Sequence, residues 1–236
     1  MSLARELSLH TLDEIVQRCE LRERGGPYLP LPVGGLRLFH GDGGVRRLVY
    51  VELATVGLDA HMIYAFTASD SPLPHFTLDA VHAGPGFAFH LDLVPRVDLA
   101  ANPAYVDAIY EPLTPTFTAA REMEGLSPAH LAPRQRALMS PWMLAHRADE
   151  PAFRGLDAPV EVYLEHWSRL LADGLSEALC SRLYGGDAAA LGERDRRLRA
   201  AIFDPEVDPV WDMVTRLVGA EVGEAMRAVL RDPEAV

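Results

Sequence analysis

The chain has 236 residues, of which 49% are hydrophobic and 24% charged, and its formal net charge is −12. This composition is sufficient for a globular core and excludes a chain that is disordered throughout, and no apolar run is long enough to cross a bilayer. The acidic charge argues against nucleic acid and anionic membrane surfaces as partners. Residues 1–24 do not resemble a signal peptide and the two cysteines show no metal-type spacing, so we expect a cytoplasmic protein.

The first predicted element is a helix within residues 3–22. Leu12, Ile15 and Val16 belong to a set of apolar residues at helical spacing. The Gly-Gly-Pro sequence at residues 25–27 breaks this pattern and predicts a turn.

Between residues 36 and 93 the apolar pattern changes to a period of two, which is typical of β-strands. Turns rich in glycine and proline separate the runs, and such short connections favour an antiparallel meander. The predicted strands are residues 36–39, 47–56, 61–68, 76–83 and 86–93.

The second half of the chain has mainly helical spacing. Helices are predicted at residues 102–111, 115–123, 159–183, 194–203 and 210–230, with one more strand within residues 138–147. Because strands come first and helices later without regular alternation, the sequence predicts an α+β fold. We expect one domain over residues 1–236, with an N-terminal helix and turn (1–29), a mainly sheet region (30–150) and mainly C-terminal helices (151–236).

The motifs that usually mark bound cofactors are missing. No glycine pattern matches a dinucleotide or phosphate-binding loop, and the basic residues are all arginine, which excludes a Schiff-base lysine. The nine histidines and two cysteines do not show the spacing of a metal site. We therefore expect no metal and no bound cofactor.

Two carboxylates interrupt otherwise apolar strands. Glu52 lies within the sequence LVYVELA, and Asp79 lies within FTLDAV. A carboxyl group held in an apolar pocket tends to keep its proton near neutral pH and can act as a general acid. From the pattern alone each is either such a proton donor or a charge on the solvent face of a half-buried sheet.

Several segments, in order, resemble the ferredoxin-dependent bilin reductases, a family that includes red chlorophyll catabolite reductases. The resemblance spans roughly residues 30–232 and rests on the whole series, since no single motif is diagnostic. The segments are YVELATVG at 50–57, LPHFTLDAV at 73–81, LDLVP at 91–95, residues 96–110, SPWMLAHR at 140–147 and residues 208–232.

The resemblance implies a three-layer α/β/α sandwich, with a central antiparallel sheet flanked by helices and substrate bound between the sheet and the C-terminal helices. It also implies that ferredoxin delivers electrons singly, that the bound tetrapyrrole becomes a radical, and that side-chain acids supply protons. Under this interpretation Asp79 donates to the substrate, Glu52 serves another edge and Asp208 a distal position.

The same resemblance suggests three substrate-binding residues. Arg147 is expected to pair with a propionate, since a guanidinium can bind a carboxylate through two hydrogen bonds. Tyr64 stands where, counted from Glu52, one branch of the family has a histidine beside the aspartate. His75 belongs to the segment that carries Asp79.

Three functions remain open at this stage. The first is an oxidoreductase that reduces the CH–CH groups of a linear tetrapyrrole such as biliverdin or a chlorophyll catabolite. The second is the same fold used as an oxidoreductase or oxygenase on another aromatic substrate in a biosynthetic pathway, with flavin as a cofactor in that case. The third is a pigment-binding protein without catalysis.

Overall fold

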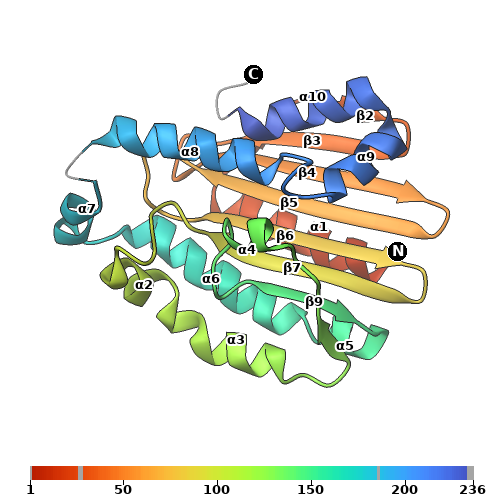
Figure 1. Cartoon of the computed structure of the whole chain (residues 1–236), viewed down its shortest axis with the longest axis horizontal. Coiled ribbons are helices and arrows are strands. Elements are labelled where there is room, and N and C mark those ends of the chain that lie inside the picture. The colour runs from red at the N-terminus through yellow and green to blue at the C-terminus, as the bar shows by residue number, and fades with distance from the viewer. Residues whose placement is uncertain (1, 26–28, 185–186, 233–236) are drawn as a thin grey trace.

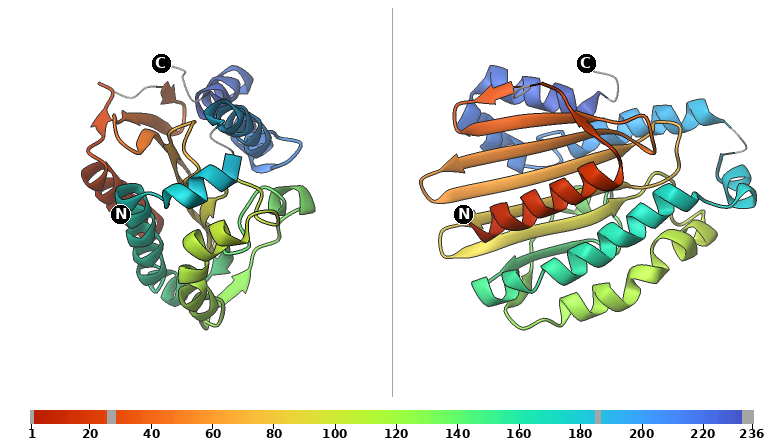
Figure 2. Two further views of the ribbon diagram at one scale, coloured as in Figure 1. Left: turned by 90° about the vertical axis from the view of Figure 1, so that its left-hand side faces the viewer. Right: turned by 180° about the vertical axis from the view of Figure 1, so that it is seen from behind.

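The computed structural model describes residues 2–25, 29–184 and 187–232 of the chain, and Gly26 and Pro27 of the predicted break lie outside these residues. A twisted antiparallel sheet forms the middle layer, and helices cover both of its faces (Figures 1 and 2). The predicted α+β sandwich is therefore confirmed. Among the described residues, no helix has both the length and the apolar character needed to span a membrane.

The sheet contains nine strands within the described part of the chain, in the spatial order β1-β3-β4-β5-β6-β7-β9-β8, with β2 paired to β3. All the pairings are antiparallel. The strands are β1 (Arg22–Glu23), β2 (Leu29–Leu31), β3 (Gly34–His40), β4 (Val45–Thr55), β5 (Leu58–Thr67), β6 (His75–Ala83), β7 (Gly86–Val94), β8 (Leu126–Pro128) and β9 (Leu144–Ala148).

The helices divide between the two faces. Helices α1, α3 and α6 lie behind the sheet in the view of Figure 1, whereas α8, α9 and α10 lie in front of it. The helical segments are α1 (Leu3–Arg18), α2 (Pro103–Ile109), the 3₁₀ turn η1 (Glu111–Leu113), α3 (Thr114–Arg121), α4 (Pro133–Arg136), α5 (Glu150–Arg154), α6 (Asp157–Asp173), α7 (Glu177–Tyr184), α8 (Ala188–Ile202), α9 (Val210–Val218) and α10 (Ala220–Arg231).

The five strands of the predicted meander are present, with ends that differ by a few residues. Two long predicted helices are wrong, because each is two helices. Residues 159–183 are divided at Gly174, with φ 69°, and residues 210–230 at Gly219, with φ 91°. Glycine adopts this left-handed conformation at little cost and so ends a helix. The strand expected within residues 138–147 begins only at Leu144.

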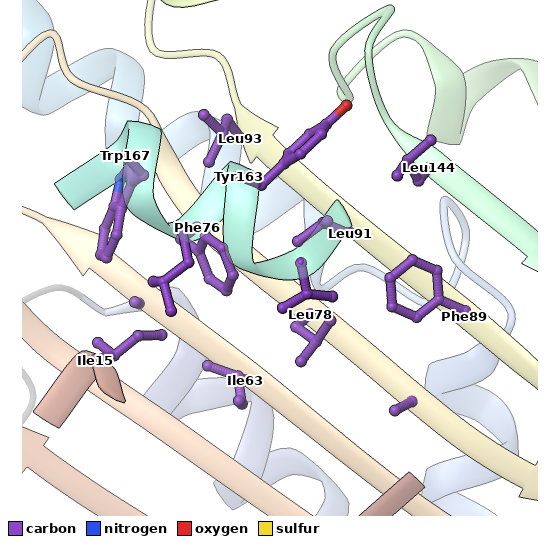
Figure 3. Close-up of a cluster of buried hydrophobic side chains, with 14 of the residues drawn as sticks. Ile15, Ile63, Phe76, Leu78, Phe89, Leu91, Leu93, Leu144, Tyr163 and Trp167 are labelled. Atoms are coloured by element: carbon purple, nitrogen blue, oxygen red, sulfur yellow. The ribbon is translucent and has the colours of Figure 1, made fainter. Parts of the chain in front are cut away.

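The face that carries α1 and α6, here called the closed face, has a continuous apolar core. Strands β6 and β7 contribute Phe76, Leu78, Phe89 and Leu91, which are almost completely buried in one cluster, and Phe76 packs on Trp167 of α6 with 5.4 Å between ring centroids (Figure 3). The Trp167 indole N–H donates to the carbonyl of Pro74 at 2.8 Å, so its polar atom is satisfied within the core.

The opposite face is here called the C-terminal face. Over β3, β4 and β5 it is apolar and packs on α8, α9 and α10, with Phe203, Trp211 and Met226 as buried anchors. Over β6, β7 and β9 the cover is incomplete, since Ala88 and Arg147, which pair with each other on this face, are exposed. The polar residues of the candidate site lie between these two regions.

Candidate functional site

The β6–β7 hairpin places Asp79 directly opposite His90. The chain turns at Gly84 and Pro85, and the register from Ala83–Gly86 onward pairs Asp79 with His90. The Asp79 Oδ2 and His90 Nδ1 atoms are 3.4 Å apart. Directly opposed residues of an antiparallel pair point to the same face, so both side chains lie on the C-terminal face.

Each of these two side chains has one polar atom that makes no hydrogen bond within the described residues. Asp79 Oδ1 and His90 Nε2 are buried and have no hydrogen-bond partner among the described residues. The two side chains are nevertheless 26% and 21% exposed. Buried polar atoms are normally hydrogen-bonded, so an unpartnered pair beside an accessible surface is a candidate site for a bound molecule.

The charges around His90 change its acidity. Desolvation disfavours the imidazolium, but the hydrogen bond and the charge of Asp79, together with the charges of Asp92 and Asp208, outweigh it and raise the pKa of His90 above its ordinary value. Burial raises the pKa of Asp92 to about 6, against the opposing hydrogen bonds from Ser140. Because its own pKa is raised, His90 holds a proton at a higher pH than a free histidine does.

Asp208 approaches the same face from the loop before α9. Its Oδ1 accepts a hydrogen bond from the N–H of Val210 at 3.0 Å, and Gln135 of α4 donates to its side chain. Burial, reinforced by the nearby charge of Asp79, raises the pKa of Asp208 above its ordinary value. The structure thus brings Asp208 into the electrostatic neighbourhood of Asp79 and His90.

Tyr64 lies on the same face, in β5. Its cross-strand partner is Thr77, which is two residues from Asp79 on β6. The ring is buried and packs edge-on against Phe203, with 5.2 Å between ring centroids. Burial and the charges of Asp79 and Asp208 raise the pKa of Tyr64 well above its ordinary value, so its hydroxyl stays protonated at neutral pH.

Glu52, expected to serve another edge of the substrate, lies on the opposite, closed face. Glu52 pairs with His61 of β5, whereas the next residue, Met62, pairs with Asp79. Neighbouring residues of a strand point to opposite faces, so Glu52 and Asp79 are separated by the sheet. The Glu52 carboxylate lies 3.8 Å from the guanidinium of Arg5 in α1.

His75 and Arg147, two of the predicted substrate-binding residues, have different surroundings. His75 is buried, its Nε2 lies 2.7 Å from Asp195 of α8, and its Nδ1 accepts a hydrogen bond from the backbone N–H of Thr67. Both ring nitrogens are thus occupied by the protein, and burial lowers the pKa of His75 to about 3. Arg147 is exposed on the C-terminal face and is available to a bound molecule.

The residue that the sequence analysis missed is His90. The sequence does contain a pattern that predicts this pairing. Asp79 and His90 are equally distant along the chain from the centre of the Gly84–Pro85 turn, and a tight hairpin pairs such residues. The same counting about the turn at Val56–Gly57 pairs Glu52 with His61. Within the residues that the structure describes, no group of three or more His, Cys, Asp or Glu is arranged to hold a metal ion.

No protein-family model matches the chain, and no curated protein matches it in sequence. The fold itself is that of the ferredoxin-dependent bilin reductases, as the sequence resemblance implied. A solved structure with this fold is phytochromobilin synthase from tomato in complex with biliverdin. The two structures superpose with a TM-score of 0.71 at 16% identity, over 94% of this chain and 80% of the synthase chain. At this identity the likeness establishes the fold alone.

Proposed function

We propose that this protein is an oxidoreductase that reduces a linear tetrapyrrole bound on the C-terminal face, beside Asp79 and His90. The observation that carries the proposal is the Asp79–His90 pair, whose unpartnered polar atoms lie at an accessible part of that face. The shared fold with a synthase whose structure holds biliverdin supports the choice of substrate class.

The chemistry of the proposed reaction requires electrons from outside. Reduction of one carbon–carbon double bond takes two electrons and two protons, and we expect ferredoxin or a similar donor to supply the electrons one at a time. The first electron produces a substrate radical, and the protein then supplies protons to it. No metal or flavin is required in this scheme.

Three residues on the C-terminal face, Asp79, His90 and Asp208, have proposed roles in supplying protons to the substrate. Asp79 is the proposed donor to the substrate, and His90, with its raised pKa, holds a proton that can replace the one donated. Asp208 keeps its proton to a higher pH than an ordinary aspartate and is the proposed donor at a second position. The exposed Arg147 is suited to a propionate of the substrate.

An absorbance titration of the purified protein with biliverdin, followed by a ferredoxin reducing system without oxygen, tests the proposal. We expect a shifted spectrum on binding and then bleaching or a new band on reduction. Binding without any reduction would contradict the enzymatic role and favour a pigment-binding protein. The absence of a shift at micromolar pigment would contradict the substrate class.

One observation favours a second candidate function, in which the same fold acts on another aromatic substrate. Glu52, predicted to serve one edge of the tetrapyrrole, lies across the sheet from Asp79. An oxidoreductase or oxygenase with a different substrate needs only the acids on the C-terminal face. Tight binding of a smaller aromatic compound, with no response to biliverdin, would support this alternative.

A further inference from the structure

A polar pocket lies at the end of the sheet away from the β6–β7 turn, under α8. Its volume is about 370 Å³. It is separate from the candidate site, because His75, which is bonded to α8 there, is four residues from Asp79 along β6, or roughly 13 Å at the rise of a strand. The pocket is lined by Arg46, Arg47, Thr67, Ala68, Ser69, Asp70 and Arg199.

A β-bulge brings two consecutive arginines to this pocket. The register between β4 and β5 shifts between Val45 and Arg47, so Arg46 has no partner in the ladder. In a regular strand Arg46 and Arg47 would point to opposite faces, whereas a bulge redirects one of them. Arg47 is buried and donates to the backbone carbonyls of Val229 and Asp232, and Arg46 is exposed and donates to the carbonyl of Asp42.

Arg199 of α8 provides the third guanidinium, and it is 1% exposed. Its Nε donates to Asp195 at 3.1 Å, and its guanidinium carbon lies 3.7 Å from the centre of the Phe66 ring. Its Nη1 is buried and has no hydrogen-bond partner among the described residues. Burying a guanidinium N–H without an acceptor is unfavourable in free energy, so Arg199 Nη1 is a candidate donor to a bound molecule.

The charges of the residues that line the pocket also favour a bound anion. Among the described residues that line the pocket, three carry guanidinium groups and one, the exposed Asp70, carries a carboxylate. Behind the lining, Asp195 is already shared between Arg199, His75 and Arg96. Burial, with the nearby positive charge of Arg96, lowers the pKa of Arg199 to about 10 despite Asp195. Asp195 alone therefore faces two buried guanidinium groups, those of Arg199 and Arg96, and an anion in the pocket would add a second negative charge beside Arg199.

We propose that this pocket binds an oxoanion of the phosphate class, either free phosphate or the phosphate group of a small metabolite. Arg199 and Arg46 hold its oxygens through charge-assisted hydrogen bonds, for which the planar guanidinium is well suited. Such a site adds to the proposed function and does not depend on it, because none of its lining residues belongs to the Asp79 site.

The test is thermal unfolding of the whole chain with increasing inorganic phosphate, compared with sodium chloride at equal ionic strength. We expect a saturable rise in the midpoint with phosphate and none with chloride. Arg46→Gln removes an exposed lining guanidinium without disturbing the core, and should weaken the apparent phosphate affinity by about tenfold. Arg154→Ala is the matched control, because Arg154 is an exposed arginine of α5 paired with Glu150.

Adenosine monophosphate, titrated in the same way, distinguishes the two sources of the anion. Tighter binding than phosphate, again weakened by Arg46→Gln, assigns the site to a phosphorylated metabolite, and weaker binding assigns it to the free ion. Equal effects of phosphate and chloride on the parent protein would overturn the proposal. A phosphate response that Arg46→Gln and Arg154→Ala leave equally intact would also overturn it, since binding would then lie elsewhere.

Discussion

The two faces of the central sheet are built from the same strands but have opposite characters. In β6, Phe76, Leu78 and Ala80 enter the closed-face core, whereas Thr77 and Asp79 lie on the C-terminal face. Helices α1 and α6 cover the closed face (Figures 1 and 2). On the C-terminal face Ala88 is exposed, so the cover is incomplete there.

The two faces therefore serve different purposes, since one contributes mainly to stability and the other has polar side chains accessible to a bound molecule. Complete burial of apolar side chains along the closed face contributes favourably to the free energy of folding. That stability can offset the cost of polar atoms such as Asp79 Oδ1 and His90 Nε2 on the other face, which have no hydrogen-bond partner in the described part of the chain. Such unsatisfied groups are often found at functional sites, where a ligand completes their hydrogen bonds.

The largest expected effect is on catalysis and comes from Asp79→Asn. This change keeps the shape of the side chain and removes its acid, so the rate of tetrapyrrole reduction should fall by about 10² to 10⁴ while pigment binding persists. Glu52→Gln is the matched control on the closed face and should leave the rate within about twofold. Anaerobic single-turnover absorbance measures both, and equal losses in the two variants would contradict the assignment of the site to one face.

The next effect concerns stability and compares two residues of β6. Leu78→Ala leaves a cavity in the fully buried core and should lower the free energy of unfolding by about 3 kcal/mol. Val81→Ala, on the partly covered C-terminal face, should cost less than about 1 kcal/mol. Urea unfolding provides both values. A larger loss for Val81→Ala than for Leu78→Ala would show that the C-terminal face is the main core.

A smaller effect is expected from the exposed arginine of the C-terminal face. Arg147→Ala should weaken biliverdin binding by about fivefold, the effect of losing one solvent-exposed ion pair with a propionate. Arg154→Ala, which changes an arginine on the closed-face side, should leave the affinity unchanged. The absorbance titration measures both, and the Arg147 effect should decrease at high salt. An unchanged affinity in Arg147→Ala would remove this residue from the binding site.

The smallest effect is the pH dependence of the Asp79–His90 pair. Because the folded-state pKa of His90 is raised, its stabilising contribution is fully present below the ordinary histidine pKa and is lost as pH rises through the folded value. His90→Gln should therefore reduce stability by about 1 kcal/mol near pH 5.5 and by less near pH 8.5.

The control for that prediction is His82→Gln, which changes a histidine of the same hairpin that stacks on Phe87. Urea unfolding of the parent and both variants at the two pH values gives the comparison. A difference between the parent and His90→Gln that does not vary with pH would show that the pair is not charged in the folded state.

Much of the fold was predictable from local patterns. The period-two run from residue 36 to 93 and its glycine turns predicted the meander, because alternation and tight turns are encoded by neighbouring residues. The short strands β1, β2 and β8 were missed, since a segment of two or three residues has too little pattern of its own and forms only by pairing with an established strand. The helix breaks at Gly174 and Gly219 were also missed, because a glycine within an apolar helical pattern does not reveal its φ angle.

The candidate site was predictable in part. Asp79 was selected because it interrupts an apolar strand, and Asp208 from the resemblance, and the structure brings the two acids close enough for the charge of Asp79 to act on Asp208. The face of Glu52 relative to Asp79 did not follow from alternation, because alternation orders residues within one strand, whereas the relation between strands depends on register. His75 was selected for its place in the chain, but its partner Asp195 comes from a helix 120 residues away.

Local pattern was enough to predict an α+β fold with carboxylates in its inner strands, because period and turn chemistry depend on neighbouring residues, and the layered sandwich followed from the family resemblance. The tertiary structure was needed to show which of those carboxylates share a face, that Asp79 lies beside His90, and that Arg46, Arg47 and Arg199 line one pocket. The physical reason is that hydrogen-bond register and helix packing join distant segments, and the electrostatic environment of a side chain depends on all the segments that meet around it.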